Sequence, residues 1–185
     1  MKNVVITFSI LFAGMLLVSQ AEARSGQSHH AHLLHEAAYA GNDADEFGAE
    51  FGALMQDYFG LKEALVESDL EQAGSKSHAM GERLDEIGPH RLEGDEHMFW
   101  MNRFEDLAGE ITAIHDAENL DDVREHFSSL SDQLVEIVST LGTGDNVYHQ
   151  YCPMAEAGWL SDEEEIRNPY KPETMLGCGR IEAKM

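Results

Sequence analysis

The sequence predicts an all-α protein, namely an up-and-down four-helix bundle followed by an irregular C-terminal segment that carries cysteine and methionine. Three observations predict this fold. Between residues 43 and 142, apolar side chains recur at spacings of three and four, which is the period of an amphipathic helix. Capping residues and glycine-containing turns divide this stretch into four, and the short connections favour antiparallel neighbours. From residue 143 to residue 185 no helical period is sustained.

The first predicted helix begins at Asp43, which can cap it, and Glu46 completes a capping-box pattern three residues later. Its apolar face is formed by Phe47, Phe51, Leu54, Tyr58, Leu61 and Leu65. A second capping box, Ser68 with Glu71, opens the second helix. The apolar positions of that helix are Leu70, Ala73, Met80, Leu84 and Ile87. The glycine–proline pair at 88–89 ends it, because proline cannot donate a hydrogen bond to the preceding turn.

Asp95 is the expected cap of the third helix, and Asn119 opens the fourth. The third helix carries Trp100, Phe104, Leu107, Ile111 and Ile114 on its apolar face. The fourth carries Val123, Phe127, Leu130, Leu134, Ile137 and Leu141, whose alternating steps of four and three are typical of a bundle seam. Gly142 and Gly144 end this helix. We expect the segment from residue 143 to residue 185 to pack on the bundle through Trp159 and Tyr148.

Residues 1–23 have the pattern of a secretory signal peptide. Lys2 precedes an apolar run from Val4 to Val18, and residues 21–23 supply the small-x-small cleavage pattern. The run is shorter than the ~20 residues that a transmembrane helix needs, although an uncleaved anchor is the alternative. We therefore expect a periplasmic or secreted protein without membrane association after cleavage.

Residues 24–42 are predicted to form a flexible, histidine-rich arm. His29, His30, His32 and His35 stand close together on it. Neutral imidazoles at this spacing suit borderline ions such as Cu²⁺, Zn²⁺ or Ni²⁺. The alternative is a solvated arm without a fixed site.

The net charge of −23, from 12 basic and 35 acidic side chains, argues against binding to nucleic acid or to an anionic lipid surface. Catalysis also finds little support. The sequence has no glycine-rich phosphate loop, no His-Glu-x-x-His and no Gly-x-Ser-x-Gly. Cys152 beside a histidine could act as a nucleophile, but no third group to orient the pair is identifiable. We expect a protein that is not an enzyme.

Both cysteines lie in the C-terminal segment, and each has a methionine nearby. The two motifs are Cys152-Pro153-Met154 and Met175-Leu176-Gly177-Cys178. Thiolate and thioether ligands select Cu(I), and by analogy Ag(I), over harder cations. His149 could add an imidazole. The alternative is a Cys152–Cys178 disulfide, which would close a loop of roughly 25 residues and stabilise the fold by about 3 kcal/mol.

Several motifs together resemble a bacterial family of unknown function. In the tail they are Tyr148, Cys152-Pro153-Met154, Trp159-Leu160, Ile166-Arg167-Asn168-Pro169-Tyr170 and Met175-Leu176-Gly177-Cys178-Gly179. In the helices they are Tyr58, Leu61-Lys62, Ala64-Leu65 and Asp69, with Arg124, Phe127 and Leu130-Ser131. Members occur as small secreted proteins and at the C-terminus of heavy-metal efflux periplasmic adaptors. The chain departs from the family at Tyr170-Lys171-Pro172-Glu173, where an aromatic residue and a glycine are usual.

The resemblance implies a periplasmic helical domain associated with copper or silver handling, with Cys152, Met154, Met175 and Cys178 as ligands. We therefore expect a soft-metal chaperone or buffer that binds Cu(I) or Ag(I), with a heavy-metal efflux pump or its adaptor as a possible partner. One alternative is an interaction module that docks on an envelope efflux complex and uses Cys152–Cys178 only as a structural disulfide. The other is an enzyme that uses Cys152.

Overall fold

The structure is a computed structural model, and it describes the backbone of residues 27–142 and 146–185 and the side chains of residues 46–142 and 146–185. The predicted signal peptide (residues 1–23) and the side chains of the histidine-rich arm lie outside these described residues. The chain forms two compact units, Met1–Glu36 and Ala37–Met185. All of the contacts discussed below belong to the second unit.

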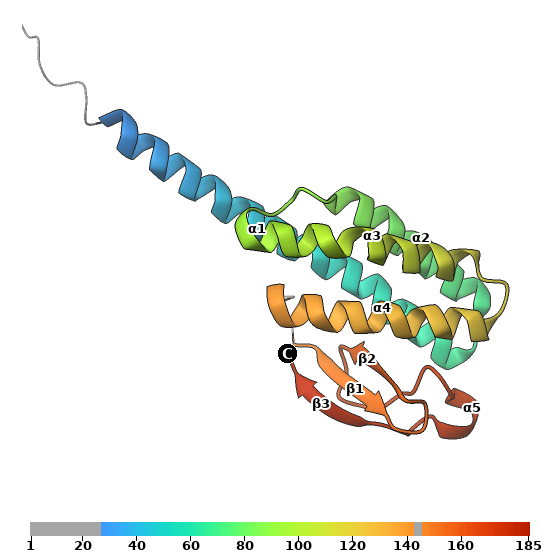
Figure 1. Cartoon of the computed structure of the whole chain (residues 1–185). Coiled ribbons are helices and arrows are strands. Elements are labelled where there is room, and N and C mark those ends of the chain that lie inside the picture. The colour runs from blue at the N-terminus through green and yellow to red at the C-terminus, as the bar shows by residue number, and fades with distance from the viewer. Residues whose placement is uncertain (1–26, 143–145) are drawn as a thin grey trace, which may run out of the picture. The chain divides into compact units, whose positions relative to one another are not determined.

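Four long helices make up most of the described chain (Figure 1), which confirms that the protein is mainly helical. Their bounds are α1 (Gln27–Glu67), α2 (Leu70–Ile87), α3 (Gly94–Asp116) and α4 (Leu120–Leu141). Of the predicted caps, Asn119 is confirmed, since its side chain accepts hydrogen bonds from the backbone of Asp121 and Asp122. Gly88 and Gly142 end α2 and α4, both with positive φ.

The other three predicted caps are wrong. Helix α1 begins at Gln27 and runs through Asp43, so no cap is needed there. The cap of α2 is Asp69 rather than Ser68, because the Asp69 carboxylate accepts a hydrogen bond of 2.9 Å from the Gln72 amide. Helix α3 already includes Asp95, and the residue that precedes it, Glu93, makes no side-chain cap.

Helices that follow one another in sequence run antiparallel. Between α2 and α3, the Ser77 hydroxyl donates to the Ile111 carbonyl, and the Trp100 indole donates to the carbonyl of Gly88. Gly88, at the end of α2, thus meets Trp100, near the start of α3, whereas the earlier Ser77 meets the later Ile111. Ion pairs of α1 show the same reversal: Asp57 pairs with Lys76 of α2, and the earlier Glu50 pairs with Arg91, which follows α2. Between α3 and α4, Glu110 pairs with His126, and the earlier Arg103 pairs with Glu136. This arrangement is that of an up-and-down bundle.

The predicted helix faces form the core. Nearly all of their residues are buried, whereas Leu70, Phe104 and Leu141 are partly buried and pack against the rest. Among the described residues, no helix combines the length and the apolar character needed to cross a lipid bilayer.

The C-terminal segment is not irregular, and the all-α prediction is wrong there. It contains β1 (Tyr148–Cys152), β2 (Ala157–Ser161), the short helix α5 (Pro172–Met175) and β3 (Arg180–Lys184). The strands form an antiparallel sheet in the order β2-β1-β3. All five residues of β2 are buried, so this strand lacks the alternation of polar and apolar residues by which a strand is recognised in sequence.

Buried hydrogen bonds attach this sheet to the helices. The Tyr58 hydroxyl of α1 lies 2.7 Å from the Ser131 hydroxyl of α4 and accepts a hydrogen bond from the Leu160 amide of β2. The ammonium group of Lys62, which is 1% exposed, donates to the Ser161 hydroxyl. Tyr58 and Lys62 therefore fasten β2 to the bundle.

Of the two residues predicted to dock the tail, Trp159 is fully buried. Tyr148 is only half-buried, and its ring lies under the ammonium group of Lys184. Tyr170 makes the aromatic contact to the bundle instead, with ring centroids 5.8 Å from Phe127 and 6.1 Å from Trp159.

Burial raises the pKa of the Tyr58 phenol well above its ordinary value, because the charged form would lose its hydration. The raised pKa stabilises the folded state below the unfolded pKa of about 10, and this contribution is lost as the pH rises further. Tyr58→Phe is expected to cost about 1–3 kcal/mol at neutral pH, because it leaves the Leu160 amide without its acceptor. Urea unfolding at pH 8 and pH 11 should then show a smaller alkaline loss in Tyr58→Phe than in the wild type. An equal loss would contradict this role of the phenol.

Candidate functional site

The sheet topology brings the two cysteines together. Cys152 is the last residue of β1, and Cys178 stands two residues before β3. Because β1 and β3 are antiparallel neighbours, with Tyr151 opposite Arg180, the end of β1 lies beside the start of β3. The cysteines form a disulfide across this end of the sheet, with their Cα atoms 5.6 Å apart. Cys152 is fully buried, and Cys178 is half-buried.

Each methionine lies within three residues of its cysteine. Met154 belongs to the turn between β1 and β2, and 62% of it is exposed. Met175 ends α5 and is half-buried, and its carbonyl accepts a hydrogen bond from the Cys178 amide. The Lys171 ammonium group, at the start of α5, donates to the Met154 carbonyl, which connects the two turns. Neither methionine belongs to the core, in contrast to the fully buried Met80 of α2.

His149 is not brought to the cysteine pair. It lies on β1 three residues before Cys152, a separation of about 10 Å along an extended strand. Side chains of a strand alternate between its faces, so His149 and Cys152 point to opposite sides of the sheet. The His149 ring lies against Gly158 of β2, where an added Cβ would meet the ring at 2.8 Å.

The segment between β2 and β3 covers the face of the sheet that carries Cys152. On that face, the Gln150 amide donates to the carbonyl of Glu163 at 2.9 Å. Near the end of this segment, a Cβ added to Gly179 would meet the side chains of Ile166 and Trp159 at 2.8 and 3.1 Å. The side chains of the acidic run, residues 162–165, are exposed, and the backbone carbonyls of residues 163–165 accept hydrogen bonds from the Gln150 amide.

Other motif residues of the helices and the tail have structural roles. The Arg124 guanidinium of α4 donates to the carbonyls of Pro169 and Leu65, so it links the tail to the end of α1. The buried Asn168 side chain accepts a hydrogen bond from the Tyr170 amide, and the Asn168 amide donates to the Leu176 carbonyl. Asn168 thus closes the loop that presents Met175 and Cys178. The sequence marked Arg124 and Asn168 as motif residues but did not reveal these roles. The carbonyls that they bond, those of Pro169 and Leu176, lie 45 and 8 residues away in the chain.

The chemistry available at this end of the sheet depends on its redox state. A disulfide has no thiolate and is a poor ligand for a metal ion. Reduction by a dithiol would place two electrons and two protons on the cysteine pair and leave the donor as a disulfide. Two thiols on adjacent strand ends, with a thioether on each flanking turn, form a donor set that suits a soft monovalent cation.

The fold and this site define an antiparallel four-helix protein with a small C-terminal sheet, closed by one disulfide between motifs that also carry methionine. The chain belongs to the family described as "Protein of unknown function (DUF3347)", whose pattern matches residues 54–146. The match begins within α1 and ends just before β1, so it covers most of the bundle and leaves the cysteine motifs outside. No curated protein and no solved structure matches the chain.

Proposed function

We propose that the reduced protein binds one soft monovalent metal ion, Cu(I) or Ag(I), through Cys152 and Cys178 with help from Met154 and Met175. The observation that carries this proposal is the convergence of both cysteines at one end of the sheet, with a methionine outside the core within three residues of each. A disulfide alone requires no thioethers. The solvent-exposed Met154 gives an incoming ion a first contact, and the half-buried Cys178 gives access to its buried partner.

In this function the protein is a metal chaperone or buffer of the periplasm, linked to heavy-metal efflux or resistance. The signal-peptide pattern of residues 1–23 supports this setting, as does the resemblance of the chain to a family that includes small secreted proteins and domains of heavy-metal efflux adaptors. The disulfide is then the metal-free, oxidised form. Binding releases protons from the thiols, so the affinity for Cu(I) should fall as the pH falls.

The second candidate is an interaction module that docks on an envelope efflux complex. The observation in its favour is the disulfide itself, whose buried Cys152 belongs to the core. In this case the cysteines stabilise the sheet and have no metal to bind.

Anaerobic titration of the reduced protein with Cu(I), against a competing chelator, separates the two candidates. Metal binding predicts one tightly held ion per chain and loss of that ion in Cys152→Ser. Absence of competition with the chelator, in a protein whose disulfide reforms quantitatively in air, would leave the interaction module as the function.

Met154→Leu tests the thioether separately. Leucine keeps the approximate volume of the side chain and removes the sulfur, so the fold should persist while Cu(I) affinity falls at least about tenfold, which is the lower end of what even an outer-shell partner contributes. Met98→Leu is the matched control, because Met98 lies on α3 with a similar exposure of 56%. Equal affinities of the two variants would exclude Met154 from the site.

A further inference from the structure

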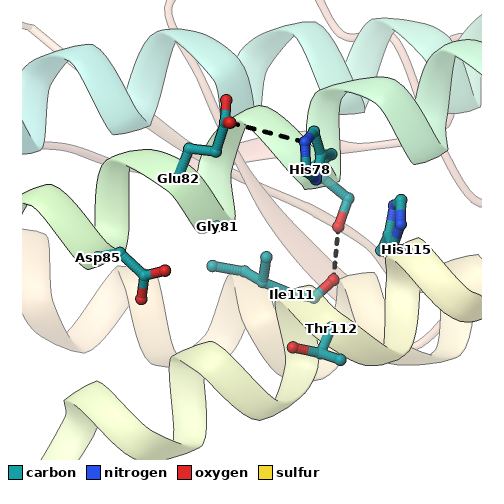
Figure 2. Close-up of a pocket in the computed structure, with 8 residues that line it drawn as sticks. His78, Gly81, Glu82, Asp85, Ile111, Thr112 and His115 are labelled. Atoms are coloured by element: carbon teal, nitrogen blue, oxygen red, sulfur yellow. Dashed lines mark hydrogen bonds and ion pairs between the residues drawn. The ribbon is translucent and has the colours of Figure 1, made fainter.

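A surface pocket of about 190 Å³ lies between α2 and α3. None of its lining residues belongs to the sheet that carries the cysteines. Figure 2 shows His78 and Glu82 on one helix, joined by a dashed line, with His115 on the neighbouring helix. All three side chains line the pocket. Sequence reasoning missed them, because His78 and His115 are 37 residues apart and only their helix packing places them together.

The two imidazole rings have the spacing of two ligands of one ion. Their centroids are 5.3 Å apart, with planes tilted by 34°. Two imidazoles bound to a tetrahedral zinc ion through Zn–N bonds of 2.0–2.1 Å would have centroids about 5.2 Å apart. The packing of α2 on α3 therefore places the rings at a separation that suits chelation.

A hydrogen bond prepares His115 for such binding. Its Nδ1 lies 3.3 Å from the Gly74 carbonyl oxygen. A carbonyl can only accept, so this contact favours the neutral tautomer in which Nδ1 carries the proton and Nε2 has the lone pair that binds a metal ion. A backbone carbonyl bonded to the other ring nitrogen is the usual second-shell support of a metal-binding histidine.

Glu82 supplies an oxygen beside His78. The two residues are one helical turn apart, and the Nε2 of His78 lies 3.7 Å from a Glu82 carboxylate oxygen. Two donor atoms on the same tetrahedral ion lie about 3.3 Å apart, so a small movement closes this pair. His78 and Glu82 have side chains that are 63% and 69% exposed, which leaves them free to turn toward the ion.

The floor of the pocket keeps the two helices in place. The Ser77 hydroxyl donates to the Ile111 carbonyl at 2.5 Å and is fully buried. The Thr112 hydroxyl, also in the pocket lining, is satisfied by the Ala108 carbonyl within its own helix. The histidines and Glu82 therefore project from a rigid base. Within residues 46–142 and 146–185, no three His, Cys, Asp or Glu side chains are already gathered around one point, so the third ligand has to move inward when the ion binds.

We propose that His78, His115 and Glu82 form a binding site for a borderline divalent cation of the zinc type, which bridges α2 and α3. Two imidazoles and one carboxylate suit zinc better than Cu(I), Mg²⁺ or Ca²⁺, and water completes the coordination. The net charge of −23 raises the local concentration of cations. This site is independent of the sulfur site in its residues, its metal and its redox requirement.

The test uses the full chain with its disulfide intact, so that the cysteines cannot take the metal. Zinc should raise the thermal unfolding midpoint of the wild type, because an ion that bridges two helices binds only the folded state. His78→Gln and His115→Gln should each remove this rise and weaken zinc binding at least about tenfold. His126→Gln is the matched control, since His126 faces Glu110 on the other side of α3 without a second imidazole and should keep the full rise.

The four arm histidines are present in every variant, so their zinc binding cancels in the comparison. An unchanged rise in His78→Gln, no rise in the wild type, or an equal loss in His126→Gln would each overturn the proposal. Modification of the wild type by diethyl pyrocarbonate, mapped by peptide mass spectrometry, gives a test without substitutions. Zinc should protect His78 and His115 and leave His126 reactive, whereas equal modification with and without zinc would also overturn it.

Discussion

Phe127→Ala is expected to lower the free energy of unfolding by about 3–5 kcal/mol. The Phe127 ring is fully buried on α4 and stacks on Tyr58 of α1, with centroids 5.2 Å apart. It also lies 5.8 Å from the ring of Tyr170. Truncation thus opens a cavity where α1, α4 and the tail meet, and these three elements cannot all collapse into it. Urea unfolding followed by circular dichroism measures the loss.

Phe99→Ala is the control for this substitution. Phe99 lies on α3, is half-buried, and has the Arg103 guanidinium 5.5 Å from its ring centroid. Because part of its ring already contacts water, its truncation should cost clearly less. A Phe127→Ala protein that melts within about one degree of the wild type would mean that the apolar face of α4 does not hold the core.

Replacement of both cysteines by alanine is expected to cost about 3 kcal/mol of unfolding free energy. The Cys152–Cys178 disulfide closes a loop with a sequence separation of 26, and its removal gives the unfolded chain more conformational freedom. Urea unfolding of the oxidised wild type and of the double variant gives the difference. Reduction of the wild type should reproduce the loss, and the same reductant should leave the double variant unchanged. Equal stability of the oxidised and reduced wild type would contradict a stabilising role for the disulfide.

The same measurement connects stability with the proposed function. An ion that binds only the folded, reduced protein stabilises it by about 2.7 kcal/mol when its free concentration is 100 times the Kd. Cu(I) should therefore restore to the reduced wild type much of the stability that the loss of the disulfide removes. It should not do so in the double alanine variant.

The bundle was predictable because each helix is marked by the spacing of its own apolar residues and by residues next to its ends. The repeat of apolar residues at spacings of three and four marked the faces of all four helices, and these faces form most of the core. Asn119 was found because a cap bonds to the next two or three backbone amides. At residues 68–69 two capping residues stand side by side, and local sequence does not choose between them. The structure places the cap at Asp69, where the carboxylate reaches the Gln72 amide.

The sheet was not predictable in this way. Each strand has five residues, and β2 is buried throughout, so no alternation of polar and apolar residues marks it. Its buried environment comes from partners far along the chain, such as Tyr58, which lies 102 residues before Leu160. The sequence of a five-residue segment does not indicate which distant residues will bury it.

The sequence by itself determined that there are four helices, which faces they bury and which cysteines and methionines the proposed site would use, since all of these depend on residue type and short spacing. Only the tertiary structure decided which of these groups meet. Antiparallel pairing of β1 and β3 joins Cys152 to Cys178, and strand alternation directs His149 away from them. The packing of α2 on α3 places His78 opposite His115. Such pairs depend on how elements distant in the chain are packed, and packing is set by the whole core rather than by any one segment.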